Sequence, residues 1–385
     1  MARATPLIPP PQTDIPLGDG RSVRIGAQVG RGSMATVYRG VYESGFALTR
    51  TVAVKVFDVI ASDEHDAVLA SLASASRRSA CVRHPNVVRV EDFGLLGPAQ
   101  PYAIEELVEG RTLSTLMAQC ARRRERVTLD LALFLGIEIA EALAGARLAS
   151  SPEGVRLGVV HGELSTSDVL LSWQGEVKVS DFAVAAAARA ASMVRSVRGL
   201  ARRVRALAPE VARGQIGDAR SDVFSLGVIL REMLVGPRFP PFVSDSEALA
   251  WAREGIVHQS MFEPHLPPPL HALLARSLER DPMRRYPHAG ALGYDLRRVA
   301  LTMGVGDGRW VLRNALARAF GEAGADDEDE VTGEMRLPRP SGVVDRFARL
   351  RGDGLDSDGV PAAMESGTVA IGCAVDRDDD DAEEA

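Results

Sequence analysis

The stretch that most constrains this chain is residues 161–183, HGELSTSDVLLSWQGEVKVSDFA. A polar turn comes first, and two short apolar runs follow it, at 169–171 and 177–179. Between these runs, residues 173–175 (Trp-Gln-Gly) have the composition of a tight turn. The stretch therefore predicts a β-hairpin that begins and ends in polar residues.

This hairpin predicts a site for charged groups at one of its ends. It would hold the carboxylates of Glu163, Asp168 and Asp181 together at that end. Carboxylates that converge on one mouth repel each other unless a cation lies among them. Phosphates bound with magnesium would satisfy that need.

The two polar ends of the stretch carry a resemblance to a known family. His161-Gly162-Glu163-Leu164 resembles the catalytic loop of the eukaryotic-type (Hanks-type) serine/threonine protein kinases found in bacteria, and Asp181-Phe182-Ala183 resembles their metal-binding DFG motif. The resemblance implies a two-lobed α+β fold, with a small β-rich N-lobe, a larger helical C-lobe and ATP in the cleft between them.

A glycine-rich loop and a lysine extend the resemblance toward the N-terminus. Residues 29–37, VGRGSMATV, resemble the family's loop over the phosphates, with Ala35 in place of the third glycine, and VAVK at 52–55 follows. Lys55 and Lys178 are the only lysines among 45 basic residues, so a lysine at this place carries more information than an arginine. The resemblance implies nucleotide contacts at Val29, Gly30, Gly32, Ala35, Val37, Ala53, Lys55, Glu106, Val108 and Leu170.

The catalytic loop departs from the family pattern in ways that bear on the rate. Glu163 stands where the family has its catalytic aspartate, and Ser165 replaces a lysine that steadies the transferring phosphate. The resemblance implies that Glu163 orients the attacking hydroxyl, while Asp168 and Asp181 bind Mg²⁺ and Lys55 contacts the α and β phosphates. We expect phosphotransfer to be weakened or lost and ATP binding to be kept.

The usual partner of the phosphate-binding lysine is missing. The family places a glutamate on the helix that follows, but no acid occurs here between Asp66 and Glu91. Glu105 lies in the segment YAIEELVEG, which resembles the linker between the lobes. One hypothesis is that Glu105 replaces the helix acid as the partner of Lys55; the alternative is a one-residue register shift that leaves Glu105 in solvent.

Other residues are expected to hold the fold together. The resemblance implies an ion pair between Glu210 and Arg285, and an Asp222 side chain that braces the backbone of the catalytic loop. It also implies that His161 packs against Phe182 and is structural. The activation segment, from Asp181 to Glu210, is rich in arginine. These arginines either bind a phosphorylated partner or the chain's own acidic tail, or they lie on a solvated loop.

The order of strand and helix patterns divides the chain. Strand-like alternation fills residues 21–57, 87–93 and 102–108, which predicts a five-stranded sheet with one helix at 63–80. An amphipathic helix is predicted at 129–149, and further helices at 221–235, 246–254, 268–279, 288–302 and 309–321. The predicted parts are a Pro-rich disordered lead (1–20), the N-lobe (21–108), the C-lobe (109–305), a terminal helix (306–321) and an acidic disordered tail (322–385).

Composition excludes several other kinds of protein. The tail carries 19 acids against six arginines, and the rest of the chain is only weakly basic, which is not a nucleic-acid-binding profile. No apolar run is long enough for a membrane anchor, and three scattered cysteines indicate reduced thiols in a cytoplasmic chain.

Three functions fit these patterns. The chain is expected to be an ATP-dependent serine/threonine kinase acting on a protein substrate, or a catalytically inactive pseudokinase that binds signalling partners. The HGEL sequence is also similar to the HGDL of aminoglycoside kinases, which suggests a small-molecule phosphotransferase. The motifs around Glu210 and Asp222 argue against that third function.

Overall fold

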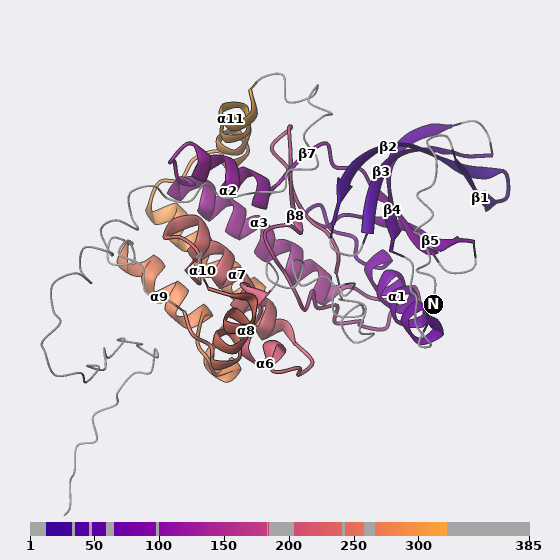
Figure 1. Cartoon of the computed structure of the whole chain (residues 1–385). Coiled ribbons are helices and arrows are strands. Elements are labelled where there is room, and N and C mark those ends of the chain that lie inside the picture. Colours follow the sequence, from indigo (N-terminus) through magenta and orange to yellow (C-terminus); the bar gives the residue numbers. More distant parts are fainter. Residues whose placement is uncertain are drawn as a thin grey trace, which may run out of the picture.

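The computed structural model describes residues 13–32, 35–45, 48–58, 65–97, 100–182, 184, 204–240, 243–257 and 266–321. One part is a six-stranded antiparallel sheet with one helix, and the other contains the remaining helices and a three-stranded sheet (Figure 1). This is the two-lobed α+β arrangement of a protein kinase, and we refer to the parts as the N-lobe and the C-lobe.

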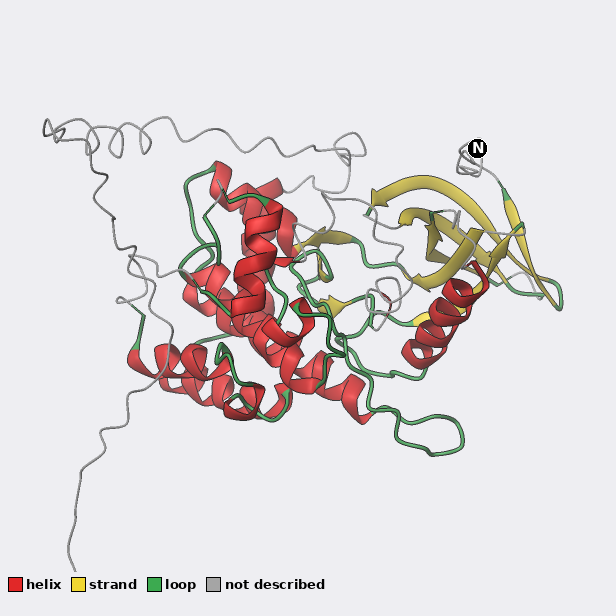
Figure 2. Ribbon diagram, turned by 60° about the horizontal axis from the view of Figure 1, so that its bottom comes forward, coloured by secondary structure: helices red, strands yellow, loops and turns green. Residues whose placement is uncertain are grey.

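The N-lobe sheet follows from alternating apolar residues. Its strands are ordered β1-β2-β3-β4-β6-β5, and the side chains that point to the core include Val23, Val54 and Ile104. The bounds are β2 (Arg21–Arg31), β3 (Ala35–Glu43), β4 (Thr49–Phe57), β5 (Val90–Leu96) and β6 (Gln100–Glu106). Helix α1 (His65–Ala80) packs its buried residues against the other side of the sheet, and Figure 2 shows the helix beside the strands.

The sheet has a sixth strand that the sequence analysis missed. Residues 14–18 form β1 (Asp14–Gly18), so assigning 1–20 to a disordered lead was wrong for this segment. Ile15 pairs with Val23 of β2, and both side chains are buried. Because β1 is an edge strand, Pro16 can be accommodated there without breaking an interior ladder. The proline content alone did not show that a pairing partner was available.

The predicted hairpin lies in a small sheet between the six-stranded sheet and the helices (Figure 1). Strands β8 (Val169–Ser172) and β9 (Val177–Val179) pair in antiparallel register, with Val169 opposite Val179. Strand β7 (Gly110–Thr112), which follows the linker between the lobes, adds to the other edge of β8. The polar ends of the hairpin therefore meet at the junction of the two lobes.

The C-lobe is built around helix α3 (Leu129–Leu148). The sequence favoured an amphipathic helix here, but consecutive residues such as Leu131, Ala132 and Leu133 are all buried, so the helix is enclosed on most sides. The helices around it are α2 (Leu113–Arg122), α6 (Pro209–Ala212), α7 (Ala219–Leu234), α8 (Asp245–Glu254), α9 (Pro268–Ser277), the 3₁₀ helix η2 (Pro282–Arg284), α10 (Ala289–Thr302) and α11 (Gly308–Phe320).

Helix α11 forms where the sequence predicts a terminal helix, and it packs against α2 and α3. The Arg111 guanidinium of β7 lies over the rings of both Trp173 and Phe320, at 5.1 and 5.5 Å from their centroids. Within the described residues, no helix combines the length and the apolar composition that crossing a bilayer requires.

Candidate active site

An ion pair between the lobes lies at the centre of the site. Lys55 extends from β4, and its Nζ donates to Oδ1 of Asp181, which directly follows the hairpin. These residues are 126 positions apart in the chain, and both side chains are largely buried. Asp181 has a positive φ of 64°, a strained conformation for a residue other than glycine. The hairpin end thus presents its carboxylate to the sheet of the N-lobe.

Glu105 is a second carboxylate near this lysine. Glu105 lies on β6 opposite Ala53 of β4. Ala53 is two residues before Lys55, so the side chains of Glu105 and Lys55 extend from the same face of the sheet. Burial raises the pKa of Glu105 to about 7, although the charge of Lys55 lowers it. Glu105 is 8% exposed, so the alternative that leaves it in solvent is wrong. The direct ion pair of Lys55 is nevertheless with Asp181, and Glu105 acts on the amine as a neighbouring charge.

The buried residues of the helix beside Lys55 include no acid. The buried side chains of α1 are apolar or hydroxylic, among them Val68, Leu72 and Ala75, which pack with Phe57. Burial lowers the pKa of the Lys55 amine, but Asp181, Glu105 and Asp168 raise it, and the net result is a pKa above the ordinary value. Carboxylates from β6 and the hairpin therefore keep this amine charged without help from α1.

The catalytic loop is held by α7 as the resemblance implies. Asp222 accepts the backbone N–H groups of His161 and Gly162, each at 2.9 Å. The His161 ring is fully buried and packs against Phe182 with 5.0 Å between ring centroids, which confirms its structural role. The Phe182 carbonyl accepts the Ser79 hydroxyl of α1 at 2.8 Å, a contact between the lobes that the sequence did not indicate.

The predicted metal ligands lie at the open end of the hairpin. The Asp168 Oδ2 accepts both the N–H and the hydroxyl of Ser165, each at 2.8 Å, and its carbonyl accepts the Ser180 N–H at 2.9 Å. Glu163 is buried in the same loop. Among the described residues, no three His, Cys, Asp or Glu side chains gather as a metal site. Glu163, Asp168 and Asp181 therefore do not form a three-carboxylate metal site. A pair, Asp168 and Asp181, still fits Mg²⁺, which proteins often hold by one or two carboxylates together with substrate phosphates.

The predicted nucleotide contacts lie on strands around Lys55. Val37 of β3 is opposite Lys55 and also pairs with Gly30 of β2. Ser33 and Met34 of the glycine-rich sequence are outside the described residues, and so are Ala183 and most of the activation segment. The remaining predicted contacts lie on β2 or just after it (Val29, Gly32), on β3 (Ala35), on β4 (Ala53), at the end of β6 and in the linker (Glu106, Val108), and on β8 (Leu170).

A second pair between the lobes was not foreseen. Lys178 of β9 lies 2.8 Å from Oε1 of Glu106, measured from its Nζ. The signal that could have revealed it was the scarcity of lysine, because Lys178 is one of only two lysines in the chain. With Lys55, it gives each of the two lysines a partner in the opposite lobe.

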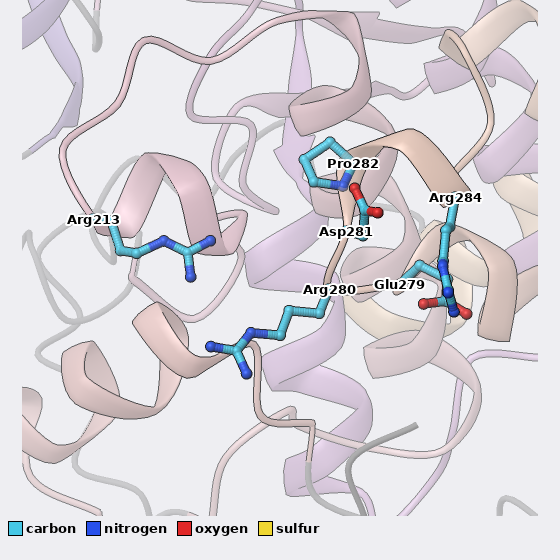
Figure 3. Close-up of a pocket in the computed structure, with 6 residues that line it drawn as sticks. All are labelled: Arg213, Glu279, Arg280, Asp281, Pro282 and Arg284. Carbon is cyan, nitrogen blue, oxygen red and sulfur yellow. The ribbon is translucent and has the colours of Figure 1, made fainter. Parts of the chain in front are cut away.

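The predicted fold-holding pair also forms. Arg285 donates from Nη1 and Nη2 to the two carboxylate oxygens of Glu210 at 2.7 and 2.9 Å, and Ser221 donates to the same carboxylate. An open pocket of about 430 Å³ adjoins this region (Figure 3). It is lined by Arg213, Glu279, Arg280, Asp281, Pro282 and Arg284. Mixed charges line it, and it contains none of the predicted site residues.

Comparison with known proteins gives consistent matches. A family model described as protein tyrosine and serine/threonine kinase matches residues 23–291. A probable serine/threonine-protein kinase of Streptomyces coelicolor, SCO3848, is 32% identical over 327 residues, which cover 82% of this chain and 45% of that protein.

Two further relatives give similar values. The serine/threonine-protein kinase PknB of Mycolicibacterium smegmatis is 31% identical over 83% of this chain and 49% of its own length. The tyrosine-protein kinase MasK of Myxococcus xanthus is 29% identical over 86% of this chain and 51% of its own length. The chain thus spans about half the length of the curated relatives it matches.

Proposed function

The chain belongs to the protein tyrosine and serine/threonine kinase family, and from that membership we propose that it binds ATP with Mg²⁺ at the junction of its lobes and transfers the γ-phosphoryl group, at a reduced rate, to serine or threonine hydroxyls of a protein substrate. The observation that carries this proposal is the ion pair between Lys55 and Asp181, which joins the glycine-rich sheet to the catalytic hairpin. A buried ammonium beside a carboxylate is a suitable place for phosphate oxygens and their counter-ion.

Each side chain has a defined part in the proposed reaction. The substrate hydroxyl oxygen forms a bond to the γ-phosphorus, the bond from that phosphorus to the β–γ bridging oxygen breaks, and ADP leaves. Glu163 orients the hydroxyl and takes its proton. Lys55 exchanges its contact with Asp181 for oxygens of the α and β phosphates. Asp181 and Asp168 would hold Mg²⁺, which neutralises charge on the phosphates when bound.

Two departures support a reduced rate. Ser165 donates to Asp168 and leaves no cation beside the transferring phosphate in the catalytic loop. The face of α1 that approaches Lys55 carries no carboxylate, so nothing on this helix would hold the amine once Asp181 turns to a metal. Because positioning and electrostatics dominate phosphoryl transfer, these losses weigh more than the replacement of aspartate by Glu163.

The test is radiolabelled phosphate transfer from ATP to a general protein substrate and to the chain itself, with Lys55→Met as the matched variant. Label above the level of the variant supports the enzyme. Equal label in both proteins contradicts phosphotransfer, and a thermal-shift titration with Mg²⁺-ATP then decides whether nucleotide binding remains.

The pseudokinase alternative is favoured by the same apolar face of α1. Such a protein would bind ATP and present a surface to signalling partners without transferring phosphate. It is supported if Mg²⁺-ATP stabilises the wild type but Lys55→Met removes no label. The small-molecule phosphotransferase has less support, since the Glu210–Arg285 pair and the Asp222 brace follow the pattern of protein kinases.

A further inference from the structure

Both lysines of this chain join one lobe to the other. Lys55 of β4 reaches Asp181 after the hairpin, and Lys178 of β9 reaches Glu106 at the end of β6. The 43 other basic residues are arginines. The two lysines of this chain therefore both form ion pairs that connect the lobes. Lys55 has a role in the proposed reaction, but that reaction assigns no role to Lys178.

The place of Lys178 connects it to the site for the base. In the β8–β9 hairpin it lies opposite Leu170, so both side chains extend from the same face of the small sheet. The resemblance to the kinase family implies that Leu170 forms the floor under the adenine, and that the backbone of Glu106 and of the linker after it bonds to the adenine edge. The ion pair thus runs from the floor of the proposed base site to one of its walls.

The partial burial of the Lys178–Glu106 pair favours a contribution to the stability of the fold. The Lys178 side chain is 13% exposed and that of Glu106 29%, so solvent screens their attraction only in part. A comparable link exists between Arg39 of β3 and Glu109 of the linker, at 2.8 Å, but those side chains are 47% and 53% exposed. Pairs exposed to that degree contribute little to stability.

The backbone offers a second route between the same elements, and this route also reaches the ion pair, since the Arg89 N–H donates to Oε2 of Glu106 at 3.4 Å. The Val179 N–H of β9 donates to Asn86, and Val88 donates back to Val179. The Glu106 N–H donates to the Arg89 carbonyl at 2.9 Å. The segment 86–89 therefore fixes one side of β6, and the ion pair is the side-chain link on the side of Leu170.

We propose that Lys178 is a positioning residue for nucleotide binding. Its ammonium holds the Glu106 carboxylate, and so fixes the backbone of residues 106–108 at a set distance above Leu170. It contacts neither the phosphates nor the phosphate acceptor. This inference rests on the proposed ATP site and adds a residue to it that the family motifs do not include.

The experiment uses the full chain with Lys178→Met, Glu106→Gln, the double variant and Lys178→Arg. Arg39→Met is the matched control, because it removes an exposed pair to the same linker. We expect each of the first two variants to weaken Mg²⁺-ATP binding about tenfold, measured by calorimetry. The double variant should be no weaker than either single one, since the two share one interaction. Lys178→Arg should restore most of the affinity, and Arg39→Met should bind as the wild type does.

A second measurement does not depend on the nucleotide. Hydrogen exchange of the backbone amides at 104–112 in nucleotide-free protein should be faster in Lys178→Met than in the wild type and in Arg39→Met. Unchanged exchange in Lys178→Met, or unchanged affinity for ATP, overturns the inference. Failure of the wild type to bind Mg²⁺-ATP instead refutes the proposed function, while the exchange rates still decide whether Lys178 holds the linker.

Discussion

Lys55 keeps its charge in a place where burial opposes charge. Three carboxylates act on it, and one of them, Asp181, pairs with it directly. Glu105 of β6 is a second carboxylate beside Lys55. The α1 residues that pack in this region are apolar and carry no charge. At the scale of single residues, the site is therefore a buried ammonium group that lies beside carboxylates of both lobes.

Glu105 makes the stability of the fold depend on pH. Its folded pKa is about 7 and its ordinary value 4.5, so the unfolded chain loses this proton first as the pH rises. The free energy of unfolding should fall between pH 4.5 and 7, by on the order of 3 kcal/mol from this group, and should then level off. Glu105→Gln should lose less stability over that range. Urea titrations at pH 5 and pH 8 check this, and an equal loss in both proteins contradicts it.

Glu163 is expected to act on the rate and not on nucleotide binding. Glu163→Gln keeps the size of the side chain but removes the proton acceptor, so transfer should slow by about 10²–10⁴-fold. Glu163→Asp, which restores the residue of the family pattern, should be at least as active as the wild type. Steady-state kinetics with calorimetric ATP affinities measure both effects. A Gln variant as fast as the wild type would show that Glu163 has no part in the reaction.

At the scale of elements, buried polar contacts decide how the helices present the loops. Asp222 at the start of α7 satisfies two backbone N–H groups of the catalytic loop, and Arg285 after η2 is fully buried against Glu210 of α6. Burial raises the pKa of Glu210, but the hydrogen bonds and charge of Arg285, together with Ser221, lower it to below its ordinary value. The carboxylate is therefore charged in the fold and depends on its partner.

Arg285→Met should destabilise the fold strongly, because it leaves the Glu210 carboxylate buried without its counter-ion. We expect a loss of about 3–5 kcal/mol in the free energy of unfolding. Arg280→Met is the control, since Arg280 pairs with Glu254 on the surface, where both side chains are more than half exposed. That loss should stay below about 1 kcal/mol. Urea unfolding of both variants tests the contrast, and similar losses would contradict the special role of the buried pair.

At the scale of the whole molecule, several contacts between described residues join the lobes. Lys55–Asp181, Lys178–Glu106 and the Ser79 hydroxyl on the Phe182 carbonyl all cross the junction. A nucleotide bound at this junction would contact both lobes at once. Its binding should therefore stabilise the molecule as a unit and not one lobe alone.

Mg²⁺-ATP at about 100 times its dissociation constant should add about 2.7 kcal/mol to the stability and raise the melting temperature by roughly 5–10 °C. The two lysines offer a direct check. Amine-selective acylation followed by peptide mass spectrometry should show Lys55 protected by Mg²⁺-ATP in the wild type. An unchanged melting temperature together with unchanged labelling of Lys55 would contradict nucleotide binding at this site.

The local elements, and the residues that have a specific partner in the family pattern, could be predicted from the sequence. The β8–β9 hairpin, the Asp222 brace, the packing of His161 on Phe182 and the Glu210–Arg285 pair are all present as predicted. Hairpins depend on residues close in the chain, and the motif residues carry a recognisable chemistry at fixed spacing. Both kinds of information can be read without knowing how the chain folds back on itself.

Which distant charges meet could not be predicted, because it depends on how the folded elements pack. The tertiary structure paired Lys55 with Asp181 and left Glu105 as a buried neighbour, it gave Lys178 to Glu106, and it recruited residues 14–18 into the sheet despite Pro16. No local pattern encodes these contacts, because each depends on the register of strands far apart in the chain and on how much water the packed lobes exclude. Burial then determines how strongly the charges at the junction interact, because it limits screening by water.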